Sequence, residues 1–280
     1  MLLAGCGGGG STDGSPGSGK SSAARPSPKP APVWNRQPDS IAALGDSITV
    51  GFDACSVLAD CPEVSWSTGT DAKVDSLASR LLKKPAGHSW NHAVAGARMA
   101  DLPQQVTAAI ADRPELVTVM LGANDACTSD PAGMTSVADF RADFTASLRA
   151  LRAELPKTQV YVASVPDLMR LWSEGRENAL GKQVWKLGIC QSILRDPDAT
   201  DQAAVQRRQS VQDRVVAYNS ALKEICGADK LCRYDGGAVF GFRFTGGQLS
   251  KWDWFHPSKE GQGRLAELAY RQITRPGTPA

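Results

Sequence analysis

Three short apolar runs, separated by helical patterns, constrain this chain most strongly. They cover residues 41–44, 116–121 and 160–163, and a glycine directly follows each of the first two. An apolar run of this length is typical of a strand that is buried on both faces. Strands that alternate with helices predict a parallel sheet covered by helices on both sides. The fold class is therefore α/β, a three-layer α/β/α sandwich with a central parallel sheet.

Weaker patterns supply the other elements. Residues 137–155 predict a long helix, because large apolar residues recur there at helical spacing and Pro156 closes the pattern. We further expect two strands, over 89–94 and 232–235, and four more helices, over 72–83, 101–112, 207–225 and 258–273.

Residues 165–205 break this alternation. A connection of about 40 residues far exceeds the usual length, and this one carries a set of large apolar residues: Leu168, Met169, Leu171, Trp172, Val184, Trp185, Leu187 and Ile189. The insertion is either an extra helical layer that enlarges the core, or a cap or pocket wall for an apolar substrate chain. An insertion that follows a strand lies near the usual ligand site of such sheets, which keeps the second interpretation open.

The first 38 residues differ in composition from the rest. Residues 3–6, Leu-Ala-Gly-Cys, resemble the bacterial lipobox, in which the cysteine is lipidated, although only two residues precede them. Residues 7–33 are rich in Gly, Ser, Pro and Ala and predict a flexible tether without a core. The P-loop pattern at 14–21 lacks the strand and helix that phosphate binding needs, so we reject it. We expect a membrane tether through Cys6 in residues 1–38 and the folded domain over 39–280.

The number of cysteines, seven, indicates the redox environment in which the protein folds. One is Cys6, and six lie in the body, a number that favours three disulfides and an oxidising environment over buried free thiols in a cytosolic protein. Six cysteines allow 15 pairings. Local spacing favours the pairs Cys55–Cys61, Cys226–Cys232 and, by elimination, Cys127–Cys190. The chain is therefore expected to be exported, either extracellular or anchored at the cell envelope.

Composition excludes several classes of protein. The chain is 42% hydrophobic and 21% charged, which is ordinary for a globular protein, and no segment approaches the about 20 apolar residues of a membrane span. The tail to residue 38 holds four of the 31 basic residues and one of the 29 acidic residues, so the remainder is close to neutral. We therefore expect neither nucleic-acid binding nor a polybasic membrane patch. The three histidines do not have metal-ligand spacing, so no metal site is predicted.

Small or polar residues that could take part in catalysis follow the predicted strands. Ser47 comes just after the first strand, Gly96 after the second and Asn124 after the third. In a parallel sheet these turns share the carboxyl edge, where ligands bind. Asp253 and His256 are three residues apart, so one turn can place the carboxylate against the imidazole and leave the other ring nitrogen for a serine hydroxyl.

These residues, in their order and context, resemble the SGNH hydrolases, also called the GDSL lipase/acylhydrolase family. The matching motifs are Gly-Asp-Ser-Ile-Thr around Ser47, Asn-His-Ala-Val-Ala-Gly-Ala around Gly96, Gly-Ala-Asn-Asp around Asn124 and Asp-x-x-His ending at His256. The resemblance spans about residues 41–270. It is greatest to secreted bacterial esterases and lipases with three disulfides, and it implies the SGNH/flavodoxin-like form of the sandwich.

The resemblance implies a role for each residue. Ser47 is the nucleophile, His256 the general base and then acid, and Asp253 orients the imidazole. The oxyanion hole consists of the Ser47 and Gly96 N–H groups and the Asn124 amide. Asp253 could instead be structural, because in some relatives a backbone carbonyl orients the histidine. No cofactor is implied.

Three further polar residues near these motifs are expected to be structural. Asp46 can bind amides of its own turn. His92 is expected to be packed or hydrogen-bonded, and His88 to be exposed.

We therefore predict a carboxylic ester hydrolase that acts through an acyl-serine intermediate, on lipid or other acyl esters. A carbohydrate O-acetyl esterase is the alternative enzyme, and a non-catalytic envelope binding protein is the alternative from another class. We expect a monomer whose partner is its ester substrate.

Overall fold

The computed structural model describes residues 5, 7–11, 14 and 33–277. Cys6, the predicted lipidation site, and most of the predicted tether lie outside the described residues. The body described below belongs to the unit Pro32–Ala280. None of the described helices is long and apolar enough to cross a membrane.

Five parallel strands form the central sheet, in the order β2-β1-β3-β4-β5. Their bounds are β1 Ile41–Gly45, β2 Ser89–Asn91, β3 Leu116–Met120, β4 Gln159–Val162 and β5 Cys232–Tyr234. Strands β1, β3 and β4 are buried along their whole length, which is why their sequences are mainly apolar on both faces rather than alternating. The sheet predicted from those runs is confirmed.

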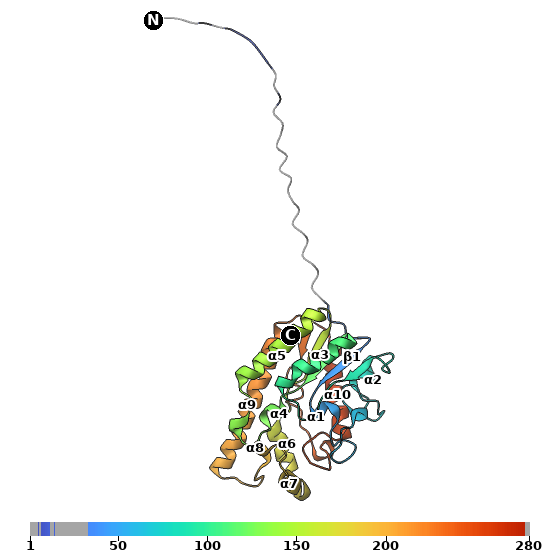
Figure 1. Ribbon diagram of the computed structural model, residues 1–280, viewed down its shortest axis with the longest axis vertical. Helices are drawn as coiled ribbons and strands as arrows, with labels where there is room; N and C mark the ends of the chain where they lie inside the picture. Colours follow the sequence, from blue (N-terminus) through green and yellow to red (C-terminus); the bar gives the residue numbers. More distant parts are fainter. Residues whose placement is uncertain (1–4, 6, 12–13, 15–32, 278–280) are drawn as a thin grey trace, which may run out of the picture. The chain divides into compact units, whose positions relative to one another are not determined.

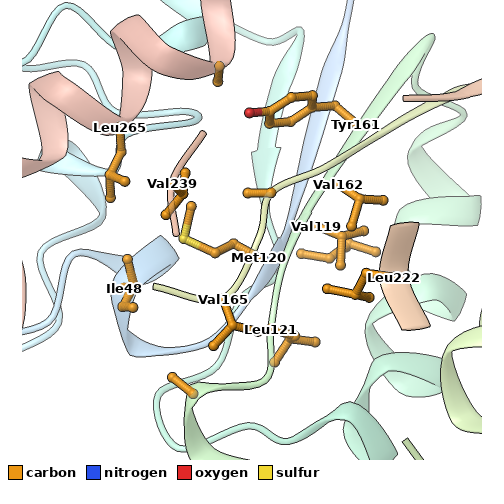
Figure 2. Close-up of a cluster of buried hydrophobic side chains, with 14 of the residues drawn as sticks. Ile48, Val119, Met120, Leu121, Tyr161, Val162, Val165, Leu222, Val239 and Leu265 are labelled. Atoms are coloured by element: carbon orange, nitrogen blue, oxygen red, sulfur yellow. The ribbon is translucent and has the colours of Figure 1, made fainter. Parts of the chain in front are cut away.

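Helices cover both faces of this sheet (Figure 1). On one side α3 Leu102–Asp112, α5 Val137–Glu154 and α9 Gln202–Gly227 contact one another in that order. On the other side α10 Lys259–Thr274 contacts α2 Leu77–Leu81. Figure 2 shows how alternate strand residues serve the two layers: Val119 and Val162 lie beside Leu222 of α9, whereas Met120 lies toward Leu265 of α10. The sheet and the helical layers on its two faces form the three-layer α/β/α architecture.

Several predicted bounds were wrong, for local reasons. The helix expected over 72–83 is only Leu77–Leu81, because Asp75 adopts a left-handed conformation (φ 50°) and the Ser76 side chain caps the helix by accepting the Ser79 N–H. The helix expected over 207–225 begins earlier, at Gln202, where Asp201 is the N-cap. The strand expected over 89–94 ends at Asn91.

The insertion at 165–205 folds into three short helices, α6 Leu168–Gly175, α7 Ala179–Trp185 and α8 Gln191–Leu194. Several of its large side chains join the main core, which supports the interpretation as an extra layer: Leu168, Leu171, Trp185, Ile193 and Leu194. Leu180 and Leu187 stay exposed. The insertion therefore adds to the core and still leaves apolar side chains on its surface.

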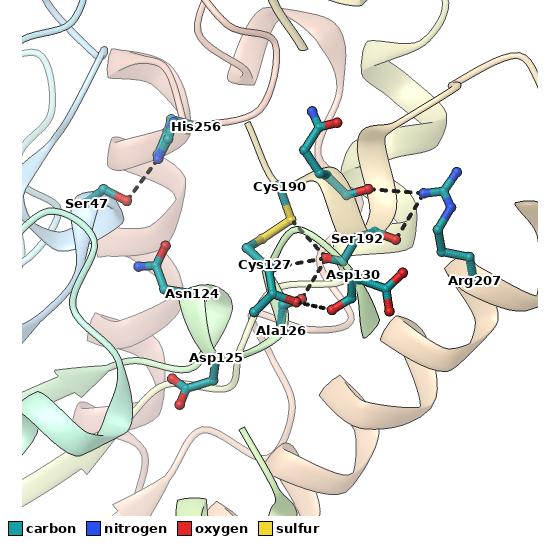
Figure 3. The surroundings of a disulfide bond; sticks show 12 residues. Ser47, Asn124, Asp125, Ala126, Cys127, Asp130, Cys190, Ser192, Arg207 and His256 are labelled. Atoms are coloured by element: carbon teal, nitrogen blue, oxygen red, sulfur yellow. Dashed lines mark hydrogen bonds between the residues drawn. A yellow bond between two sulfur atoms is a disulfide. The ribbon is translucent and has the colours of Figure 1, made fainter. Parts of the chain in front are cut away.

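Three disulfides join Cys55 to Cys61, Cys127 to Cys190 and Cys226 to Cys232, the pairs that local spacing favours. The second pair fastens the insertion to the turn after β3 (Figure 3). Ser192 strengthens this junction, since its hydroxyl donates to the Ala126 carbonyl oxygen over 2.7 Å.

The chain enters the body at the amino ends of the strands. The indole N–H of Trp34 donates to the Ile273 carbonyl oxygen over 3.0 Å. The Gln159 side chain, at the start of β4, donates to the Asn35 carbonyl oxygen over 2.9 Å. The entry point therefore lies at the edge of the sheet opposite the turns that follow the strands.

Candidate active site

Ser47 is the first residue of α1 Ser47–Val50, directly after β1. A tight turn holds it there, because the Asp46 carboxylate accepts the Ile48 N–H over 2.9 Å. Gly45 is required in this turn: a Cβ at that position would collide with Thr49 and lie 2.8 Å from the Met120 carbonyl oxygen. The serine hydroxyl therefore has a fixed position at the carboxyl edge of the sheet.

His256 lies across from Ser47, although 209 residues separate them in sequence. Its Nε2 is 2.9 Å from the Ser47 Oγ (Figure 3). Its Nδ1 bonds Asp253, which is 1% exposed and also accepts the backbone N–H groups of Phe255 and His256 over 2.9 and 3.0 Å. The rings of Phe52 and Phe255 meet the imidazole edge-on. The structure thus brings together all three residues that the sequence analysis named as nucleophile, base and orienting acid.

The Asp253–His256 pair shifts both pKa values toward the charged forms. Burial acts to lower the pKa of His256, but the charge and hydrogen bond of Asp253, with Asp46 and Asp53 adding to them, raise it above its ordinary value. Burial likewise acts to raise the pKa of Asp253, and the neighbouring imidazole lowers it overall. The carboxylate is therefore suited to stabilise an imidazolium at His256.

Two turns next to Ser47 offer hydrogen-bond donors. Gly96 lies in an exposed turn with φ 82°, a conformation that favours glycine. The Asn124 amide lies on α4 Ala123–Ala126 and donates one hydrogen to the Ala97 carbonyl oxygen over 3.0 Å. An amide has a second hydrogen, and Figure 3 shows this side chain on the side of α4 that faces Ser47 and His256. Within the part of the chain that the structure describes, no hydrogen bond occupies the Ser47 or Gly96 N–H.

Sequence reasoning missed three residues that contact the turns and the Asp253–His256 pair. The Asp125 carboxylate accepts the Met99 N–H over 2.9 Å and so links the Asn124 turn to the Gly96 turn. Trp185, in the insertion, donates from its indole to the Asp253 carbonyl oxygen over 2.7 Å. Asp53 lies buried behind the Asp253–His256 pair. Only Asp125 had a sequence signal, since it follows Asn124 in the same motif.

The structure also places the three other polar residues that the sequence analysis discussed. His92 bonds Asp112, with Nε2 2.5 Å from Oδ2, and His88 is exposed. Asp46 holds the turn of Ser47 through its hydrogen bond to the Ile48 N–H.

Asp46 gives the fold a specific dependence on pH. Its second carboxylate oxygen is buried and has no partner among the described residues. Burial raises its pKa from 3.8 to about 7, against the opposing effects of the Ile48 N–H and His256. The folded state therefore holds a proton that the unfolded state releases near pH 4, and the associated stability is lost as the pH rises toward 7.

We expect Asp46→Asn to remove this dependence. Between pH 4 and pH 8 its unfolding free energy should rise relative to wild type by on the order of 4 kcal/mol, given about 1.4 kcal/mol per pKa unit. Denaturant unfolding of both proteins at the two pH values measures this, and any constant cost of the amide cancels in the comparison. Parallel pH dependences in wild type and variant would contradict the prediction.

Comparison with known protein families gives a match over most of the folded body. A family model described as GDSL-like Lipase/Acylhydrolase matches residues 41–269. No curated protein matches the sequence.

Solved structures share the architecture at low identity. A catalytic mutant of Axe2, an acetylxylan esterase from Geobacillus stearothermophilus, is 18% identical with a TM-score of 0.53, over 85% of this chain and 95% of that one. LAE5, an alpha/beta hydrolase enzyme from the metagenome of Lake Arreo, Spain, is 16% identical with a TM-score of 0.51, over 85% and 97%. The acetyl xylan esterase AlAXEase is 13% identical with a TM-score of 0.50, over 82% and 98%. At these identities the similarity shows the fold alone.

Proposed function

Because the chain belongs to the GDSL-like lipase/acylhydrolase family and is a carboxylic ester hydrolase, we propose that Ser47 is its nucleophile and His256 its general base. The observation that carries this assignment is the 2.9 Å contact between Ser47 Oγ and His256 Nε2, with buried Asp253 bonded to the other ring nitrogen. A serine hydroxyl is a weak nucleophile, and it needs an oriented base at this distance.

The acylation step follows from these positions. His256 Nε2 accepts the Ser47 proton as Oγ attacks the ester carbonyl carbon, and the carbonyl oxygen becomes an oxyanion. The N–H groups of Ser47 and Gly96 and the amide of Asn124 donate to that oxygen. The intermediate collapses when the bond to the alkoxy oxygen breaks, and His256 returns its proton to the departing alcohol.

Deacylation repeats the same chemistry with water. His256 removes a proton from the water as its oxygen attacks the acyl carbon of the Ser47 ester. Collapse of the second intermediate releases the carboxylic acid and restores the Ser47 hydroxyl. Asp253 remains ionised throughout and holds the imidazole in place.

For the substrate we propose lipid or other acyl esters. Exposed apolar side chains on segments that contact this group support the choice. They include Leu58, whose N–H donates to Asp53, and Leu180, in helix α7. Trp254, two residues before His256, packs against Gly181 of the same helix as Leu180. A carbohydrate O-acetyl esterase remains the alternative, and a p-nitrophenyl ester series from acetate to longer chains separates the two. A sharp preference for acetate would exclude the proposed substrate class.

Active-site labelling tests the assignment of Ser47. A fluorophosphonate probe should label the wild-type protein covalently and should not label Ser47→Ala. The matched control is Ser210→Ala, which changes an exposed serine of α9 and should label like wild type. Absence of labelling in the folded wild-type protein would favour a non-catalytic binding protein instead.

We also propose that the protein is exported as a monomer and anchored through Cys6. The three disulfides favour an oxidising compartment, and the lipobox-like residues 3–6 support the anchor. Metabolic labelling with a fatty acid should be lost in Cys6→Ser, and equal labelling of both proteins would exclude the anchor.

A further inference from the structure

Asp53 is a buried acid with no role in the mechanism above. It follows α1, is 2% exposed and has φ 57°. Its backbone N–H donates to the Ala59 carbonyl oxygen over 3.0 Å, and its carboxylate accepts the Leu58 N–H. Its carbonyl oxygen accepts the Ser250 hydroxyl over 2.7 Å. These bonds, with the Cys55–Cys61 disulfide in the same loop, fix where the carboxyl points.

The Asp53 carboxyl faces the Asp253–His256 pair. One oxygen of Asp53, one oxygen of Asp253 and one ring nitrogen of His256 all lie within 4.8 Å of one another. Two buried carboxyls this close do not both ionise easily, because each negative charge opposes the other. Burial and the neighbouring Asp253 raise the pKa of Asp53, against the Leu58 N–H and His256, whereas the pKa of Asp253 is lowered. When this pair binds a proton, Asp53 is therefore the acid that holds it.

The charged side chains near Asp53 do not neutralise its carboxyl group. Lys251, Lys259 and Glu260 line a cavity of about 440 Å³ together with Asp53. Lys259 bonds Asp71 over 2.6 Å, Glu260 bonds Gln248 over 3.2 Å, and Lys251 lies 4.5 Å from the centre of the Trp252 ring. Among the described residues Asp53 has no ion-pair partner. Asp46 is a further acid whose charge raises the pKa of His256.

We propose that Asp53 is a positioning residue for ester hydrolysis, whose protonated carboxyl donates a hydrogen bond to Asp253 and limits the negative charge behind His256. This inference rests on the proposed function of Ser47 and His256. It extends the chain of interacting side chains to four members: Ser47, His256, Asp253 and Asp53.

Two substitutions distinguish this role from an ionised Asp53 and from a purely structural one. Asp53→Asn keeps an acceptor for the Leu58 N–H and places an NH₂ donor toward Asp253. Asp53→Gly removes the donor but tolerates the positive φ. The pH dependence of kcat/KM with p-nitrophenyl acetate reports the pKa of His256 in the free enzyme.

We expect Asp53→Asn to retain the wild-type acid limb and a kcat within about threefold of wild type. In Asp53→Gly the full charge of Asp253 should raise the pKa of His256 and move the acid limb about half a pH unit upward. The less well-held ring should also lower kcat about tenfold or more. Two outcomes would overturn the proposal: a downward shift in Asp53→Asn, which means that Asp53 is ionised in wild type, or an unmoved acid limb in Asp53→Gly, which means a structural role at most.

Infrared difference spectroscopy gives a readout that does not depend on activity or on Asp53→Gly folding. At neutral pH the wild-type protein should have a protonated-carboxyl C=O band that is missing in Asp53→Asn. An identical spectrum would refute the protonation. Because Ser47→Ala keeps Asp53, it should keep the band while losing fluorophosphonate labelling, so a failure of the proposed function is distinguishable from a failure of this inference.

Discussion

Alanine at His256 is expected to lower kcat for p-nitrophenyl esters by about 10⁴- to 10⁶-fold, the range found for serine hydrolases that lose a member of the triad. Without the imidazole nothing accepts the Ser47 proton, since Nε2 is the group 2.9 Å from Oγ. The same loss is expected for Ser47→Ala, because the two residues act as one unit. The double variant should therefore be no slower than either single variant.

Steady-state and burst kinetics measure this effect. The matched control is His88→Ala, which removes an exposed histidine and should retain wild-type kcat. Thermal unfolding checks that each variant is folded. A His256→Ala enzyme within tenfold of wild-type kcat would contradict its assignment as the base, and additive losses in the double variant would contradict the coupling.

Alanine at Asn124 is expected to lower kcat by about 10²- to 10³-fold with little change in KM. The amide stabilises charge that develops on the carbonyl oxygen only during the reaction, so its loss affects the transition state more than the bound substrate. The hydrogen bond to the Ala97 carbonyl oxygen is lost as well, at a cost in stability of about 1 kcal/mol.

The ratio of kcat to KM effects distinguishes the possible roles of this residue. Measurement across a range of p-nitrophenyl butyrate concentrations gives both constants, and the melting temperature gives the cost to the fold. A raised KM with unchanged kcat would assign Asn124 to substrate binding. An unchanged kcat and KM would remove it from the site altogether.

The fold was predictable where local patterns and tertiary burial agree. The continuous apolar runs at β1, β3 and β4 are buried on both faces, so their composition alone identified them as central strands. The apolar residues of 72–83 also suggested a helix, but the side chain of Ser76 and the left-handed Asp75 delay its start. Side-chain capping and backbone conformation at single residues decide where such a helix begins and ends. Hydrophobic periodicity carries no information about either.

The candidate site was predictable where its residues belong to short motifs, and less so elsewhere. Ser47, Gly96, Asn124 and His256 each lie in a recognisable sequence context, and the structure brings Ser47 and His256 into contact. Asp53 has no such context: its carboxyl meets Asp253 only because distant loops fold together, and its ionisation depends on burial that no sequence pattern reports.

The entry of the chain beside the amino ends of β3 and β4 gives the enzyme a front and a back. Ser47 lies at the carboxyl ends of the strands, which form the front, and Trp34 lies at the amino ends, which form the back. Any fusion partner joined ahead of Trp34 therefore attaches on the side opposite Ser47. The same polarity makes the N-terminus the suitable end for immobilising the protein on a solid support.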